Sequence, residues 1–269
     1  MTRGALIFAF NNDHTDYVRM AAWCASNVRQ HLSIPVAVVT NAVDHPLIGS
    51  FDKVIVAQAQ SGGGRWFQDY GAHVTWYNAG RIDAYSLTPW EHTLVLDSDF
   101  VVNSDQMTTL FETKTDFLCH RHSIDFTQPT QKLLPTFGRW QLPMYWATVM
   151  IFRRSNTAQY IFDAMSMIRN NWQHYRDLYG ISETNYRNDY ALSIALAIVN
   201  GHTDQVDSIP WDMLATLPEH ELNMYMLDNN QYWAVNYRDT ENREKTMSFA
   251  GLDFHAMGKR SLLEVIDHG

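Results

Sequence analysis

Apolar runs and amphipathic stretches alternate along the first hundred residues. Each apolar run ends at a polar residue, and the runs cover residues 4–10, 36–40, 53–57 and 93–96. Between the first two, apolar side chains recur at helical spacing from Val18 to Leu32. Buried strands that alternate with helices favour a parallel sheet. The pattern therefore predicts the α/β class, with a mixed, mostly parallel central sheet that is flanked by helices.

The second half continues the alternation of strands and helices. Ser155 is placed to cap a helix with an apolar stripe, and a long apolar run after Asp189 predicts a buried helix. Further strands are predicted at residues 116–120, 148–152, 232–237 and 252–256. Because ligands of such sheets collect at the carboxyl ends of strands, we expect the functional residues at these ends.

The segment before residue 93 is the least regular part of the first half. Residues 69–87 predict a helix that carries Val74, Tyr77 and Arg81. Residues 60–65 contain three glycines before an arginine. Such a loop could wrap a phosphate, but the P-loop lysine is absent and the composition favours a flexible connector.

Composition and charge are those of an ordinary globular protein. The chain has 269 residues, of which 46% are hydrophobic and 18% charged, so we expect a single domain over residues 1–269. The formal net charge of −9 disfavours nonspecific binding to nucleic acid or anionic membrane. Cys24 and Cys119 are too few for a disulfide scaffold, and no run is long enough to span a bilayer. These features predict a cytoplasmic location.

Two carboxylates follow the apolar strand at residues 93–96. Asp97 and Asp99 are separated by one residue, so their side chains can point to the same place beyond the strand. Hard oxygen ligands of this kind suit Mg²⁺ or Mn²⁺, particularly beside a phosphate. The alternative is a β-turn in which the two aspartates only accept backbone hydrogen bonds.

Three segments carry a resemblance to one known family: residues 88–99 (TPWEHTLVLDSD) followed by Leu110-Phe111, residues 254–259 (FHAMGK) and residues 145–152. They resemble segments of the GT-A glycosyltransferases, in particular the retaining group that includes glycogenin and the bacterial lipopolysaccharide galactosyltransferases. The first is similar to the metal-site segment of that family. Residues 254–259 (FHAMGK) resemble its histidine-glycine-lysine element, although the lysine follows the glycine directly and the usual proline-tryptophan is replaced by Arg260-Ser261. Residues 145–152 match more weakly, with Trp146-Ala147 where the family has a polar start.

The resemblance implies a set of site residues. Asp97, Asp99 and His255 would bind the metal ion, with Mn²⁺ favoured over Mg²⁺ because one ligand is a nitrogen. Asn188, Asp189 and Lys259 would act in catalysis. The other residues expected to contact the donor, a nucleoside-diphosphate sugar of the UDP type, are Phe10, Asn11, Thr40, Asn41, Arg81, Asp97, Ser98, Gly258 and Lys259.

The expected function is sugar transfer to a hydroxyl acceptor with retention of configuration. Residues 1–112 would form the nucleotide-binding half and residues 113–269 the acceptor-binding half. An inverting enzyme would need a carboxylate base, for which Asp189 or Asp125 could serve. The methionine-, tryptophan- and amide-rich composition resembles that of enzymes from large tailed phages, several of which put sugars on hydroxymethylated DNA bases. The expected acceptor is therefore either such a base or a saccharide. The alternatives are a nucleotidyltransferase and a noncatalytic nucleotide-binding module.

Overall fold

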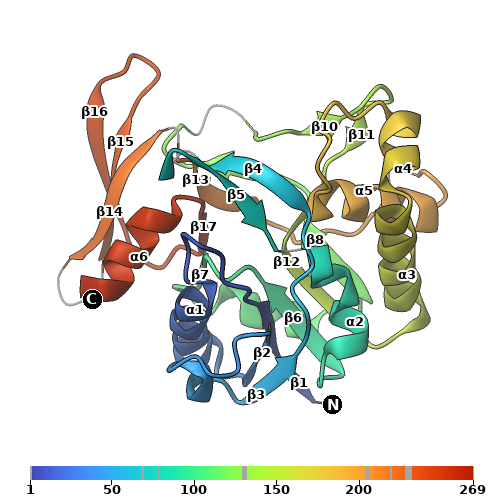
Figure 1. The fold of residues 1–269 in the computed structure, drawn as a ribbon, viewed down its shortest axis with the longest axis horizontal. Helices are drawn as coiled ribbons and strands as arrows, with labels where there is room; N and C mark the ends of the chain where they lie inside the picture. The colour runs from blue at the N-terminus through green and yellow to red at the C-terminus, as the bar shows by residue number, and fades with distance from the viewer. Residues whose placement is uncertain are drawn as a thin grey trace.

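A six-stranded sheet lies at the centre of the molecule (Figure 1). The computed structural model describes residues 2–67, 70–77, 79–128, 132–203, 206–218, 220–227 and 232–268. In sheet order, the strands are β3 (Lys53–Val56), β2 (Val36–Thr40), β1 (Arg3–Phe8), β6 (His92–Leu96), β12 (Trp146–Arg153) and β8 (Phe117–His120). β12 pairs antiparallel with both neighbours, whereas β3, β2, β1 and β6 pair in parallel. The predicted mixed, mostly parallel sheet is confirmed.

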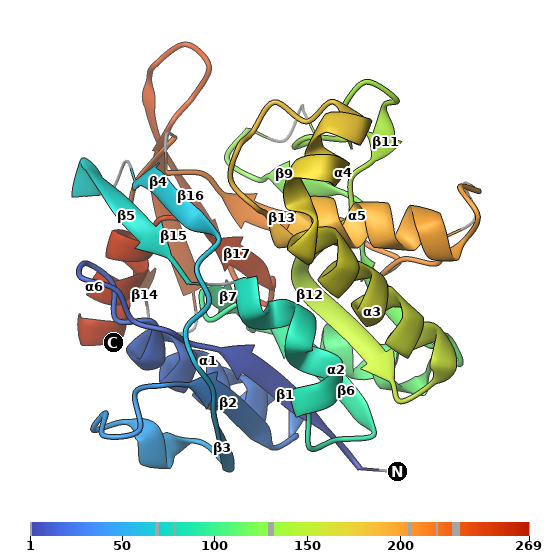
Figure 2. The same cartoon turned by 45° about the vertical axis from the view of Figure 1, so that its right-hand side comes forward.

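Helices cover both sides of this sheet. α1 (Tyr17–Leu32) packs on β1 and β2, and α5 (Asn188–Val199) packs on β12. α3 (Asn156–Asn170) packs in turn on α5, and Figure 2 shows α1 and α3 on opposite sides of the sheet. The predicted cap is present, since the Ser155 hydroxyl accepts a hydrogen bond from the Ala158 amide. The shorter helices are η1 (Ile48–Ser50), η3 (Ala79–Asp83), α2 (Ala84–Leu87), η4 (Gln106–Glu112) and α4 (Trp172–Tyr179). Among the described residues, no helix has the length and hydropathy needed to cross a membrane.

A second sheet carries the C-terminal region back to the end of β6. Its strands, in sheet order, are β7 (Phe100–Val101), β17 (Phe254–Ala256), β13 (Met213–Thr216) and β9 (Ser123–Asp125). β17 pairs with β7, which begins directly after Asp99, so His255 lies opposite Phe100. The remaining elements are β10 (Thr136–Phe137), β11 (Leu142–Pro143), β14 (Glu221–Leu227), β15 (Tyr232–Arg238), β16 (Glu244–Phe249) and α6 (Lys259–His268). Residues 97–99 and 255–259, which are far apart in the sequence, therefore lie close together in space.

The helix predicted over residues 69–87 is wrong over residues 71–77, whereas residues 79–87 are helical. β4 (Gly63–Phe67) and β5 (Ala72–Trp76) form a separate two-stranded hairpin, and helical backbone begins only at Ala79. Gly71 adopts a positive φ of 57° in the turn, and the β-branched and aromatic residues that follow favour a strand. The connector predicted at residues 60–65 is also wrong from Gly63 onward, because these residues lie in β4. Residues 69 and 78 lie outside the described part of the chain.

The strand predicted at residues 53–57 lies at the edge of the central sheet. β3 pairs only with β2, and its Val54 and Val56 are 39% and 66% exposed. The expectation of a buried strand is therefore wrong here, because an apolar run does not distinguish an edge from the interior.

Gly4 lies in β1, directly against Trp90. A Cβ atom at this position would lie 2.4 Å from Cε2 of Trp90 and 2.8 Å from the Pro35 carbonyl oxygen. We expect Gly4→Ala to lower the free energy of unfolding by about 1–3 kcal/mol, since the methyl group overpacks the interior. The control is Gly49→Ala, because no heavy atom lies within 4 Å of its added methyl group. Equal denaturation midpoints for the two variants would contradict this packing.

Candidate active site

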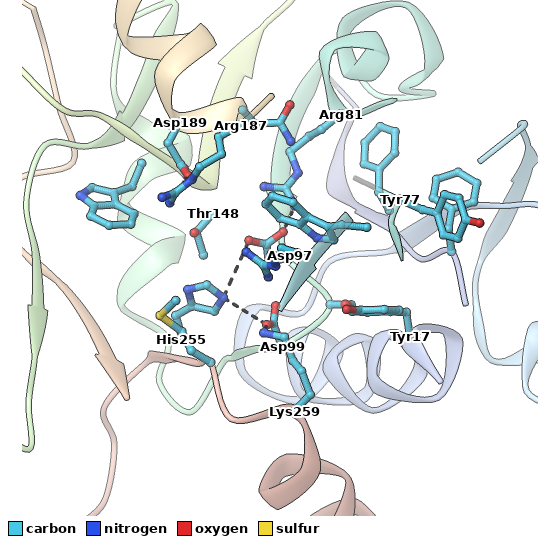
Figure 3. A pocket seen from close by; sticks show the side chains of 18 residues that line it. Tyr17, Tyr77, Arg81, Asp97, Asp99, Thr148, Arg187, Asp189, His255 and Lys259 are labelled. Carbon is cyan, nitrogen blue, oxygen red and sulfur yellow. Dashed lines mark hydrogen bonds and ion pairs between the residues drawn. The ribbon is translucent and has the colours of Figure 1, made fainter. Parts of the chain in front are cut away.

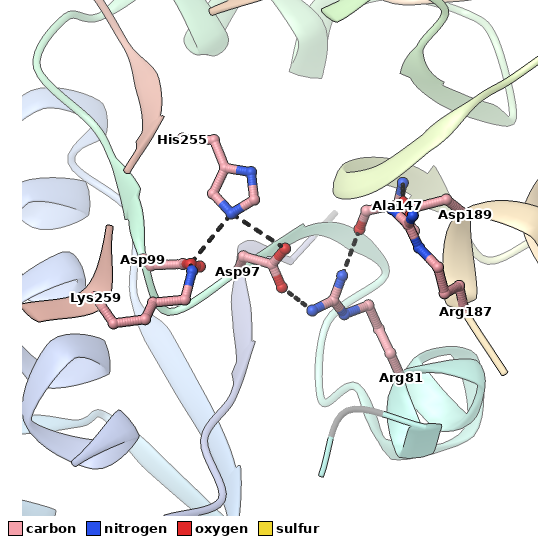
Figure 4. A network of polar contacts seen from close by, with 8 residues as sticks. All are labelled: Arg81, Asp97, Asp99, Ala147, Arg187, Asp189, His255 and Lys259. Atoms are coloured by element: carbon pink, nitrogen blue, oxygen red, sulfur yellow. Dashed lines mark hydrogen bonds and ion pairs between the residues drawn. The ribbon is translucent and has the colours of Figure 1, made fainter. Parts of the chain in front are cut away.

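Two acidic residues and one histidine meet beyond the carboxyl end of β6. Asp97 and Asp99 follow β6 directly, and β17 carries His255 to them. His255 Nε2 lies 3.2 Å from Oδ2 of Asp99 and 3.9 Å from Oδ2 of Asp97 (Figure 4). One potential ligand atom from each residue lies within 4.8 Å of the others. The three residues that were predicted from distant segments are thus close enough to share one ion.

Each of the two carboxylates also has a cationic partner. Arg81 forms an ion pair with Asp97 and donates a hydrogen bond to the Ala147 carbonyl at 2.9 Å. Lys259, at the start of α6, forms an ion pair with Asp99. Burial lowers the pKa of Arg81 to about 10, which leaves it protonated at neutral pH. The acidic pair is therefore charge-balanced by two buried cations that also face the pocket.

The imidazole of His255 is suited to bind a metal ion. Burial lowers its pKa to about 3, and the charges of Arg81 and Arg65 act in the same direction against that of Asp189. The ring is therefore neutral at ordinary pH and has a lone pair for coordination. Its Nδ1 is buried without a hydrogen-bond partner among the described groups. Two carboxylate oxygens and one imidazole nitrogen fit Mn²⁺ or Mg²⁺, with the nitrogen favouring Mn²⁺.

The opposite wall of the pocket comes from the first turn of α5. Asp189 accepts a hydrogen bond from the Ala147 amide at 3.0 Å and another from Arg187 at 3.0 Å. Arg187 and Asp189 lie beside each other in the pocket (Figure 3). Asn188 is 2% exposed and accepts a hydrogen bond from the Tyr186 hydroxyl at 3.2 Å. The carboxylate of Asp189 is thus fixed by the start of β12 and by the residue that precedes α5, and it lines the same pocket as Asp97, Asp99 and His255.

Most of the predicted site residues line this one pocket. Those that do are Phe10, Arg81, Asp97, Ser98, Asp99, Asn188, Asp189, His255 and Lys259. The other four predicted residues, Asn11, Thr40, Asn41 and Gly258, do not line it. The side chains of Asn11 and Thr40 form hydrogen bonds with residues close to them in the sequence. The Asn11 amide binds Asp16 and the backbone of Val18, and the Thr40 hydroxyl accepts a hydrogen bond from Ala42. Asn41 is exposed, and Gly258 lies against the carboxylate of Glu221, which would be 2.7 Å from an added Cβ.

Several lining residues were not predicted from the sequence. They are Phe8, Tyr17, Arg65, Trp76, Tyr77, Trp146, Thr148, Arg187 and Met257. Arg65 and Trp76 were missed because the hairpin that carries them was interpreted as a connector and a helix. Arg187 had a usable signal, since it directly precedes Asn188-Asp189 and a carboxylate at a buried helix start commonly has a cation beside it.

Comparisons with known proteins give only remote structural similarities. No protein-family model matches the chain, and no characterised protein sequence matches it. The glycosyltransferase GlyE of Streptococcus pneumoniae is 13% identical over 78% of this chain and 46% of its own, with a TM-score of 0.44. The galactosyltransferase LgtC, solved with donor and acceptor sugar analogs, is 14% identical over 71% of this chain and 70% of its own, with a TM-score of 0.46.

Mouse xyloside xylosyltransferase 1 is 12% identical over 81% of this chain and 89% of its own, with a TM-score of 0.45. Nucleotidyltransferases are also among the similar structures. This chain spans less than half of the GlyE chain. At this level of similarity neither fold nor activity transfers from these proteins to this chain, so its function has to be inferred from its own residues.

Proposed function

We propose that this protein is a metal-dependent glycosyltransferase that uses a nucleoside-diphosphate sugar as donor. The observation that carries the proposal is the cluster of Asp97, Asp99 and His255, with Arg81 and Lys259 beside it in the same pocket. Carboxylate and imidazole ligands next to fixed cations are the groups that bind a diphosphate through a divalent ion. Residues 1–112 supply two of the ligands, and residues 113–269 supply the third.

The bound ion would stabilise the negative charge that develops on the diphosphate leaving group. Lys259 and Arg81 are placed to donate further charged hydrogen bonds to phosphate oxygens, because both line the pocket beside the ligand cluster. Asn188 and Asp189, on the opposite wall, would contact the sugar. In this arrangement the bond between the anomeric carbon and the phosphate oxygen breaks between the two walls.

Retention of configuration is favoured by the state of the two carboxylates that could act as an inverting base. Asp189 is held by the Ala147 amide and by Arg187. Asp125 is 2% exposed, pairs with His220 at 2.7 Å, and does not belong to the pocket. Because both carboxylates already have hydrogen-bond or ion-pair partners, neither is free to act as the base. As the acceptor oxygen bonds to the anomeric carbon, its proton would pass to the departing phosphate oxygen. The proposed acceptor is a saccharide or a hydroxymethylated DNA base.

The alternative of a nucleotidyltransferase is disfavoured by the turn between β1 and α1. That reaction needs a glycine-rich turn whose backbone amides hold phosphates. Here the Asn12 side chain accepts the amides of His14 and Thr15, and Asn11 accepts that of Val18. Because these amides already donate hydrogen bonds to side chains of the turn, they are not available to a phosphate.

A donor screen tests the proposal. We expect hydrolysis of at least one nucleotide sugar with Mn²⁺, loss of activity with a chelator, and a smaller recovery with Mg²⁺ than with Mn²⁺. His255→Ala should weaken Mn²⁺ binding by roughly 10- to 100-fold, as measured by calorimetry. The control is His174→Ala on the exposed face of α4. If the parent protein neither hydrolyses any donor nor binds a nucleoside diphosphate in the presence of Mn²⁺, the proposal is wrong.

A further inference from the structure

Arg65 is a pocket cation without an acidic partner. It lies on β4 and lines the pocket together with Asp97, Asp99 and His255. The other cationic residues of the pocket, Arg81, Arg187 and Lys259, each pair with an aspartate. Among the described residues, no carboxylate oxygen lies within 4.0 Å of the Arg65 guanidinium. Its positive charge is therefore available to a ligand.

The hairpin holds this guanidinium in a defined place. Its central carbon lies 3.9 Å from the ring centroid of Trp76 and 4.5 Å from that of Phe67. The Asn185 side chain donates a hydrogen bond to the Gly64 carbonyl at 2.6 Å, which ties β4 to the segment before α5. Stacking between aromatic rings presents the donor groups of an arginine without the entropy cost of ordering a free side chain. The Arg65 guanidinium is thus held in an orientation in which it can bind a planar anion.

The pocket has one more cationic side chain than acidic side chains. Four cationic and three acidic side chains line it among the described residues, and an imidazole that binds a metal ion, as proposed for His255, carries no charge. The two positive charges of a divalent ion and the two negative charges of a diphosphate cancel. A neutral donor sugar would therefore leave the positive charge of the partly buried Arg65 unbalanced, which is costly where water screens it only in part.

Arg187 extends this positive region. Burial lowers the pKa of Arg65, and the nearby charge of Arg187 acts in the same direction, whereas Tyr17 and Asp189 act against it. The Nε of Arg187 is buried without a hydrogen-bond partner among the described groups. A negative group between the two guanidinium groups would relieve their repulsion and would satisfy this donor.

We propose that Arg65 binds the carboxylate of an acidic sugar, so that the protein acts on a uronic acid. This inference rests on the proposed function. Two substrates could supply the carboxylate: the sugar that is transferred or the acceptor. A carboxylate matches the planar guanidinium in two parallel hydrogen bonds, and a neutral sugar would leave these donors unpaired.

The test compares matched acidic and neutral sugars as substrates of the 269-residue protein with Mn²⁺. In the donor arm, kcat/KM for hydrolysis is measured with the glucuronate and glucose derivatives of the nucleotide that the donor screen identifies. In the acceptor arm, transfer is measured to methyl glucuronoside and to methyl glucoside. Both arms use the parent, Arg65→Met, and Arg3→Met as a control, because Arg3 is stacked on Phe111 outside the pocket. Binding of the nucleoside diphosphate alone and thermal unfolding are measured for each protein.

In one of the two arms, the parent should prefer the acidic sugar by at least about tenfold, and Arg65→Met should remove this preference, since a charged hydrogen bond has this magnitude. Arg3→Met should keep it, and nucleoside diphosphate binding should be unchanged in both variants. Equal rates with acidic and neutral sugars in both arms would overturn the inference. Weaker binding of the nucleoside diphosphate by Arg65→Met, with both sugars affected alike, would also overturn it, because Arg65 would then bind the diphosphate. A parent protein without turnover or diphosphate binding would instead refute the proposed function.

Discussion

Replacing Asp99 with asparagine is expected to reduce donor turnover by about 10² to 10³-fold. Asp99 is 5% exposed, and its carboxylate contacts both His255 and Lys259. Asparagine keeps the shape of the side chain but removes one of the two charged oxygen ligands, so both the binding of the ion and its position relative to the phosphates should suffer. Donor hydrolysis at saturating Mn²⁺ and Mn²⁺ binding by calorimetry measure the two effects separately.

The effect of Asp99→Asn on folding stability has to be measured separately from its effect on turnover. Lys259 is 6% exposed, and Asp99→Asn removes the negative charge from its buried ion pair, which destabilises a folded protein. The double variant Asp99→Asn/Lys259→Met should recover the thermal midpoint but not the turnover. Asp105→Asn, on the exposed surface nearby, is the matched control and should behave like the parent. Parental Mn²⁺ affinity and turnover in Asp99→Asn would remove the metal site from the proposal.

The sequence was sufficient to predict the regular parts of the fold. Apolar runs such as residues 36–40 and 93–96 are fully buried strands, as their composition predicted. The acidic pair Asp97 and Asp99 was singled out as a candidate metal site by its place after such a strand. His255 was assigned by its resemblance to a known motif, because no local pattern could show that β17 pairs with β7.

Only one strand of the hairpin of β4 and β5 has a clear sequence signal. Among the described residues the two strands pair with each other, β4 (GGRWF) has no alternation of apolar and polar residues, and β5 (AHVTW) does alternate but is short. Tyr77 and Val74 have the spacing of a helix turn by coincidence, which favoured the wrong element. The error hid Arg65, whose function depends on where the hairpin crosses the pocket and not on its neighbours in the sequence.

The residues predicted to bind the nucleotide show a second limit of the same kind. Asn11 and Asn41 follow strands of the central sheet and Thr40 is the last residue of β2, so all three lie at the edge where ligands of such sheets bind. Asn11 is used to hold the start of α1, and Thr40 holds the turn after β2. A polar residue at a strand end has the same sequence pattern whether it binds a ligand or the backbone. Only the hydrogen-bond partners distinguish the two uses.

Asp189→Asn is expected to lower kcat by about 10²-fold, with KM for the donor changed by less than about threefold. The carboxylate lies opposite the metal-ligand cluster, where positive charge would develop on the sugar as the bond to the phosphate breaks. Asparagine retains an oxygen that can accept the Ala147 amide, so the charge is removed while the geometry is kept. Steady-state donor hydrolysis gives both constants, and Mn²⁺ binding should be unchanged.

A purely structural role for Asp189 would give a different result. Asp189→Ala leaves the Ala147 amide without its acceptor, which costs about 1–3 kcal/mol when the group is buried. If Asp189 served only to hold β12, Asp189→Asn would keep the activity of the parent and only Asp189→Ala would lose it. Asp163→Asn, exposed on α3, controls for the loss of a negative charge at a distance. Because Asp189→Asn and Asp189→Ala share the loss of charge and differ in the backbone hydrogen bond, equally low kcat values in both would assign the effect to the charge.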